Sequence, residues 1–143
     1  MTLHVAFRVG TAEYALPAAA VLHLESFVSA THVPGAPDFV TGLVQVRGRV
    51  VPVVDLRKRF GLPPEAHALQ HRVIIVQVGP RVAGLLVDSA REVVELDETK
   101  FEKPPELIEH QATGFVTAVA SLASRLLLIV DVPHLIGEEL AHG

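Results

Sequence analysis

The segment Phe39-Val-Thr-Gly-Leu-Val-Gln-Val-Arg-Gly-Arg-Val-Val-Pro-Val-Val-Asp55 is followed, 76 positions later, by Phe115-Val-Thr-Ala-Val-Ala-Ser-Leu-Ala-Ser-Arg-Leu-Leu-Leu-Ile-Val-Asp131. The two segments align without a gap, and most positions that differ are apolar in both. A glycine six residues after each segment extends the match. The chain is therefore predicted to consist of two copies of one small unit, whose matching parts are residues 39–61 and 115–137. Because each whole copy, at about 70 residues, would have a marginal core alone, we expect the copies to pack tightly together.

The rest of the chain continues this pattern of short apolar runs broken by glycine and proline, which is typical of an all-β protein. Strands are predicted over residues 3–9, 13–16, 39–46, 49–54, 73–78, 82–87, 91–96, 115–122 and 125–130. Short helical turns are predicted at 18–24 and 56–61, with a C-terminal helix at 133–141. Pro52 cannot donate a ladder hydrogen bond, so it favours an edge strand or a bulge.

Composition limits the kind of protein. The chain has 143 residues, of which 50% are hydrophobic and only 5% aromatic, and it contains no cysteine. This length suits a single domain. The absence of cysteine excludes disulfides, thiolate metal sites and a cysteine nucleophile. The longest apolar run, 126–130, is far shorter than the roughly 20 residues of a spanning helix, so we expect a soluble cytoplasmic protein that does not insert into membranes.

The charges are unevenly distributed. The net charge is −4, which argues against a general nucleic-acid binder. Residues 38–61 nevertheless carry five bases against two acids, while residues 95–109 carry six acids against two lysines. Such a polarity suits a protein partner that docks in one orientation.

Two sets of residues could carry chemistry. Asp55 and Asp131 could form an acid–base pair, but their equivalent places before a helical turn favour two helix caps. His67 and His71 have the spacing of metal ligands on a helix, but they follow two prolines in a linker and lack a full ligand set. No nucleophile elbow, phosphate-binding loop or dinucleotide motif is present. We therefore expect no enzyme activity, no cofactor and no metal site.

Arg47 is a candidate for partner binding. It lies at the predicted turn of the first repeat, and the second repeat has Ala123 there, whereas Arg49 is kept as Arg125. A residue that the fold requires should recur in both copies. The alternative is a solvated turn arginine.

The segment 39–57, which includes the first repeat, closely resembles the signature of CheW-like domains, the coupling adaptors of bacterial chemosensory arrays. Further segments fall in the order of that family, at residues 14–17, 33–37, 81–93, 104–105 and 125–131. The resemblance implies one CheW-like domain over residues 1–143. It also implies two intertwined five-stranded SH3-like β-barrels with a shared core.

The resemblance further implies a non-catalytic adaptor with two protein partners. These are the cytoplasmic tip of a chemoreceptor and the regulatory domain of the histidine kinase CheA, with other CheW-like domains as possible neighbours in rings. Since the receptor tip is a helical hairpin, a groove that accepts a helix is expected. Family groove positions, together with two positions where this chain departs from the family, give the candidate site Val21, His23, Leu24, Gly42, Gln45, Arg47, Val73 and Val93.

The departures leave a second hypothesis open. Leu22 and His23 stand where the family commonly has Gln-Glu, and Gln45-Val46 stands where it usually has Asn-Leu. The loss of a carboxylate at His23 removes an expected polar contact. The alternative is a CheW-like decoy, or a module with a single partner in a specialised system such as surface motility, that does not activate the kinase.

Overall fold

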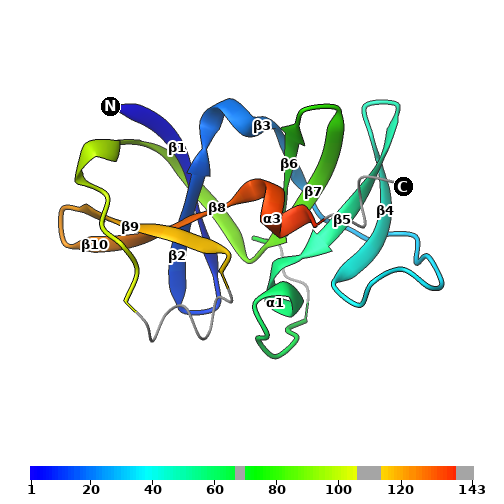
Figure 1. The fold of residues 1–143 in the computed structure, drawn as a ribbon. Coiled ribbons are helices and arrows are strands. Elements are labelled where there is room, and N and C mark those ends of the chain that lie inside the picture. Colours follow the sequence, from blue (N-terminus) through cyan, green and yellow to red (C-terminus); the bar gives the residue numbers. More distant parts are fainter. Residues whose placement is uncertain (67–69, 106–113, 138–143) are drawn as a thin grey trace.

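Ten strands form two five-stranded sheets in the computed structural model, which describes residues 1–66, 70–105 and 114–137 (Figure 1). The first barrel has the strand order β8-β1-β2-β10-β9. Its strands are β1 (Thr2–Val9), β2 (Ala12–Pro17), β8 (Ser89–Leu96), β9 (Val116–Leu122) and β10 (Arg125–Val130). The second barrel has the order β3-β6-β7-β5-β4. Its strands are β3 (Val21–Ser26), β4 (Val40–Val46), β5 (Arg49–Asp55), β6 (Arg72–Val78) and β7 (Arg81–Val87). The first barrel thus takes strands from both ends of the chain, so the two are intertwined as expected.

Short helices connect the strands. The α-helices α1 (Leu56–Arg59) and α3 (Val132–Ile136) follow the two repeat hairpins, and Figure 1 shows α3 between the barrels. Two 3-10 turns, η1 (Ala18–Ala20) and η2 (Glu98–Lys100), complete the elements that the described residues form. The expected C-terminal helix therefore begins at Val132, and residues 138–141 of that prediction lie outside the described part.

The internal repeat is visible in the backbone. The hairpin β4–β5 with α1 and the hairpin β9–β10 with α3 have matching positions, and each ends in a parallel pairing, β5 with β7 and β10 with β2. The Asp55 N–H donates to the Phe39 carbonyl at 2.8 Å, and the Asp131 N–H donates to Phe115 at the same distance. The Asp55 carboxylate accepts from the Arg57 N–H and the Asp131 carboxylate from the His134 N–H, so both carboxylates are helix caps.

Three apolar clusters hold the barrels together. One cluster takes side chains from every strand of the first barrel, so that sheet curves around its own core. A second cluster, built mainly from β5, β6 and β7, fills the second barrel. The largest cluster lies between the barrels and is called the shared core; its fully buried members include Phe7 and Leu16 from the first barrel and Ile74 and Leu85 from the second. Neither barrel could bury this face alone.

Arg59 joins the two repeat copies. Its guanidinium lies over the Phe39 ring at 3.8 Å and over the equivalent Phe115 ring at 4.9 Å. The same group donates to the carbonyls of His134 and Leu135 in α3, each at 3.0 Å. A single side chain on α1 therefore satisfies late carbonyls of α3 and bridges both copies.

One prediction of local structure is wrong. The stretch predicted as helical over 18–24 is one 3-10 turn followed by strand β3, because β3 pairs along its length with β6. Pro52 has the local edge position that its missing N–H favours, although β5 as a whole lies between β7 and β4. At Pro52 the strand pairs with β4 alone, because its pairing with β7 begins one residue later, at Val53.

Candidate functional site

The β4–β5 turn presents Arg47 on an unusual backbone. Arg47 and Gly48 have φ values of 51° and 78°, and positive values at both central residues are the pattern of a type I′ hairpin turn. Ala123, the equivalent residue between β9 and β10, has a φ of 55°. The strained backbone is therefore common to both repeats, whereas the arginine side chain belongs to only one of them.

Arg47 stands at the rim of a cavity in the second barrel. Its side chain is 68% exposed, and its Nε lies 3.4 Å from Oε1 of Glu25 on β3. The cavity of about 490 Å³, called here the Arg47 cavity, is lined by residues 25–31, 43–47 and 73. Gln45 is exposed on its wall, and Val73 is buried in it. An exposed pair of this kind contributes little to stability, so the guanidinium is available to a partner.

His23 lies beside this cavity. Its register partner on β6 is Ile75, which belongs to the core of the second barrel, so His23 lies on the inner face of its strand. A neighbouring cavity of about 360 Å³ is lined by His23, Arg47 and Arg49 among others. The imidazole and the Arg47 turn thus share one hollow at the end of the second barrel.

Val21, Leu24 and Val93 lie on the other face, toward the shared core. Leu24 is paired with Ile74, and Val93 on β8 is paired with Val5; both partners belong to the shared core. Directly paired residues point to the same side of a sheet, so Leu24 and Val93 point the same way as these core residues. Both remain exposed, at 48% and 58%, because β3 and β8 are edge strands. Val21 is half-buried and packs against the shared core.

Gly42 is needed for a contact within the chain. A Cβ at Gly42 would lie 2.3 Å from the backbone oxygen of Thr31, and its φ is 152°. Thr31 forms a two-way backbone bridge with Leu43 at 2.8 Å in each direction. The close approach that this glycine permits is therefore to the 27–31 segment, which forms one wall of the Arg47 cavity.

The eight predicted residues thus form two groups. Gln45, Arg47 and Val73 line the Arg47 cavity, with Gly42 supporting its wall and His23 in the adjacent hollow. Val21, Leu24 and Val93 border the shared core. The sequence reasoning missed Glu25, the partner of Arg47. A strand prediction at 21–26 would have indicated it, since His23 and Glu25 then fall on the same face.

Fewer positive charges of the segment 38–61 are accessible at the surface than the sequence suggests. Arg59 is held between two rings, and Arg57 donates to Asp88 through Nε at 2.9 Å and Nη2 at 2.7 Å. The pKa of Arg57 is raised chiefly by this hydrogen bonding. The positive charges of this segment that remain in exposed positions are Arg47, Arg49 and Lys58.

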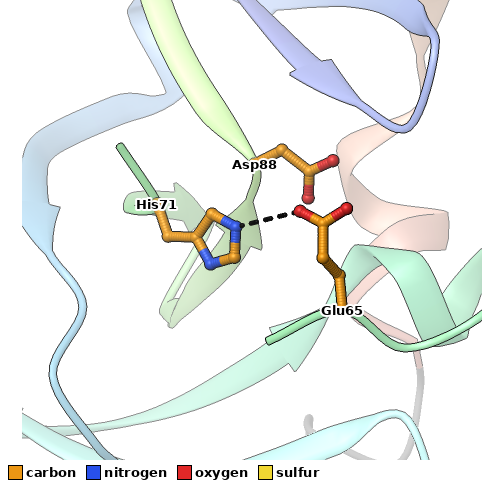
Figure 2. A group of neighbouring side chains, drawn as sticks. All are labelled: Glu65, His71 and Asp88. Atoms are coloured by element: carbon orange, nitrogen blue, oxygen red, sulfur yellow. Dashed lines mark ion pairs between the residues drawn. The ribbon is translucent and has the colours of Figure 1, made fainter. Parts of the chain in front are cut away.

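The structure also brings together a polar cluster of which the sequence indicated only the histidine. His71 is buried, and its Nε2 lies 3.6 Å from Oε1 of Glu65; the Asp88 carboxylate arrives beside them from the corner between β7 and β8 (Figure 2). Burial alone raises the pKa of Asp88, but hydrogen bonds from Arg57 and from the Gly10 N–H hold that pKa below its usual value. His67, the other histidine of the expected pair, lies outside the described residues.

Comparison with known proteins identifies the family. The sequence profile of the CheW-like domain matches residues 4–140. The chain belongs to the CheW-like domain family. CheW-like relatives include the chemotaxis protein CheW of Rhizobium meliloti, 31% identical over 127 residues, which are 89% of this chain and 82% of that protein. The chemotaxis protein CheW of Bacillus subtilis is 31% identical over 135 residues, which are 94% of this chain and 86% of that protein.

A solved CheW structure has the same fold. The crystal structure of the scaffolding protein TtCheW from Thermoanaerobacter tengcongensis superposes with a TM-score of 0.83 at 33% identity, covering 91% of this chain and 88% of that one. The CheW-like chain is therefore a chemotaxis scaffold of a non-catalytic family. None of the helices in the described ranges is long and apolar enough to cross a bilayer.

Proposed function

We propose that this protein couples chemoreceptors to the histidine kinase CheA and so allows receptor state to control kinase autophosphorylation. The observation that carries the proposal is Arg47, an exposed arginine on a turn whose backbone both repeats share but whose side chain only one has. The fold needs the turn and not the guanidinium. A partner accounts for the difference.

The receptor tip is proposed to dock as a helical hairpin against the second barrel and its border with the shared core. Leu24 and Val93 offer exposed apolar side chains on two edge strands, and Val21 extends the same face. Arginine is among the residues that most often dominate binding energy at interfaces, and the contacts around such a residue exclude water. Arg47, whose Nε contacts Glu25, would fix the orientation of the helices through hydrogen bonds.

The kinase partner is proposed to be the regulatory domain of CheA, itself a CheW-like double barrel. Contacts of one barrel with the partner's other barrel are heterologous, and such contacts close into rings when the rotation permits. Other CheW-like domains could take places in the same ring. The complex would lie in the cytoplasm, in receptor arrays at the inner membrane.

The decisive binding experiment compares Arg47→Glu with Ala123→Glu. The control puts the same charge on the equivalent turn of the first barrel, where the backbone has nearly the same φ. We expect both variants to melt near the wild-type temperature, and Arg47→Glu alone to weaken binding to a purified receptor tip at least about tenfold, or ~1.4 kcal/mol. Equal binding by Arg47→Glu and wild type would show the site assignment to be wrong.

A reconstitution separates coupling from the alternative. Receptor, CheA and this protein are combined, and kinase autophosphorylation is measured with and without the protein. Activation supports coupling. Binding without activation supports the decoy or single-partner module, for which the replacements at His23 and Gln45 are the motivation.

A further inference from the structure

Three potential metal ligands converge at the end of the second barrel that lies opposite the Arg47 turn. Glu65 comes from the segment after α1, His71 directly precedes β6, and Asp88 lies at the corner between β7 and β8. Figure 2 shows the imidazole directed at the Glu65 carboxylate, with the Asp88 carboxylate next to it. One ligand atom from each residue lies within 4.8 Å of the other two, and the Nε2–Oε1 distance is 3.6 Å.

These donors fit a divalent transition metal. An imidazole with two carboxylates is a ligand set that Zn²⁺ accepts, with three protein ligands and an open fourth position. Ligand atoms about 2.1 Å from a tetrahedral ion lie about 3.4 Å apart, close to the observed separation between His71 and Glu65. The ligand atom of Asp88 lies within 4.8 Å of the other two. We propose that Glu65, His71 and Asp88 bind a Zn²⁺ ion.

Arg57 shares the cluster and leaves room for the ion. Its Nη2 contacts Oε2 of Glu65 at 2.9 Å, so the oxygen that faces His71 is the other one, Oε1. On Asp88 the Arg57 guanidinium contacts both oxygens, and Oδ2 also accepts from the Gly10 N–H at 2.8 Å, so Oδ1 is the oxygen that keeps a lone pair for an ion. Hydrogen bonds of this kind to ligating carboxylates orient them toward a metal. Two carboxylates against one guanidinium leave a negative charge at the cluster, which favours a cation.

The fold does not require this cluster. The cavity beside it, of about 350 Å³, is lined by Thr41, Asp55 and Arg57 among others. The repeat-equivalent residues Thr117, Asp131 and Pro133 line a cavity of about 470 Å³ that first-barrel residues share with the end of β6. The equivalent of Arg57 is therefore a proline, and the first barrel forms without the charged group. Glu65 is half-exposed and lines the cavity, which gives an ion access from solvent.

A bound ion would tie three distant parts of the second barrel together. The segment after α1, the start of β6 and the β7–β8 corner would share one ligand sphere. Because the unfolded chain does not hold these residues together, binding would stabilise the native state and raise the melting temperature.

The test is calorimetric titration of the full chain with ZnCl2, together with thermal melts in the presence of ZnCl2 and of EDTA. We expect one Zn²⁺ per chain and a higher melting temperature with Zn²⁺. Glu65→Gln and His71→Gln should each weaken that binding at least about tenfold. His32→Gln is the matched control, since His32 lines the same cavity but is not in the ligand group. His67→Gln should also bind as the wild type does.

Several results would overturn the proposal. These are the absence of saturable binding at one site, an unchanged affinity in Glu65→Gln, or an equal loss in His32→Gln. A loss in His67→Gln with normal binding by Glu65→Gln would assign the ion to the His67–His71 pair instead. Circular dichroism in EDTA establishes that each variant folds. If buried His71 does not tolerate glutamine, the half-exposed Glu65 decides the outcome.

Discussion

Replacing Arg59 by methionine tests the connection between the two repeat copies. The change keeps an aliphatic chain of similar length but removes the guanidinium that lies over Phe39 and Phe115. It also removes the donors to the His134 and Leu135 carbonyls, each now held at 3.0 Å. α1 and α3 would then lose their polar connection across the centre of the molecule.

The expected cost follows from these contacts. Two charged hydrogen bonds at a half-buried site contribute about 1 kcal/mol each, and two cation–π contacts about 0.5 kcal/mol each. The sum is about 3 kcal/mol of unfolding free energy. With an unfolding entropy of about 2.1 cal/mol/K per residue, this lowers the melting temperature by about 10 °C. Urea titration and differential scanning calorimetry of wild type and Arg59→Met measure both quantities.

Two further variants make the test specific. Arg49→Met removes an exposed arginine at the start of β5 and should change stability by less than about 0.5 kcal/mol. Arg59→Lys keeps the charge but lacks the planar fork, so it should recover less than half of the loss. If Arg59→Met melts within about 3 °C of wild type, or Arg59→Lys restores full stability, the guanidinium does not bridge the repeats in the way described.

Two other predictions concern the second barrel. The pKa of Asp88 is lowered in the folded state, so its charge stabilises the protein above its unfolded pKa of about 4. This contribution is lost as the pH falls through the lower folded pKa. Asp88→Asn should therefore be less stable than wild type at pH 7, and urea titrations should show the difference shrinking below about pH 4. The charged groups that face Asp88 are Arg57, Glu65 and His71, and they are present in both proteins, so the comparison isolates Asp88. Gly42→Ala should destabilise the 27–31 segment, since its Cβ would meet the Thr31 oxygen, and faster amide exchange at Thr31 and Leu43 would report this. Unchanged exchange at both amides would contradict that account of the glycine.

The repeat could be predicted because the sequence patterns that define it are local. Alternating apolar runs, a tight turn and a capping aspartate recur at one spacing, and each of these signals acts within a few residues. The 21–26 strand was missed because three alanines precede it and favour a helix, whereas its pairing with β6 is a long-range interaction that overrides this preference. For the same reason Glu25 was not predicted as the partner of Arg47, since their contact depends on residues 21–26 forming a strand.

The polar cluster shows a different limit. His71, Glu65 and Arg57 are near one another in the sequence, but Asp88 is brought to them by the pairing of β6 with β7. Spacing along the chain carries no information about such a meeting. The metal hypothesis could therefore be considered from the sequence but not completed.

Differences between the repeats need to be interpreted by position. Arg59 and Leu135 are equivalent residues, and they touch each other, with the Arg59 Nε 3.0 Å from the Leu135 carbonyl. Where two equivalent positions touch, their side chains share one space, so the two residues differ because of packing. Such a difference gives no evidence of a binding partner. Arg47 and Ala123 are a different case. Arg47 lies on an exposed hairpin tip and pairs with Glu25 of its own barrel. No shared space forces that difference, and this is why binding by Arg47→Glu, compared with Ala123→Glu, is the sharper test of function than any substitution between the barrels.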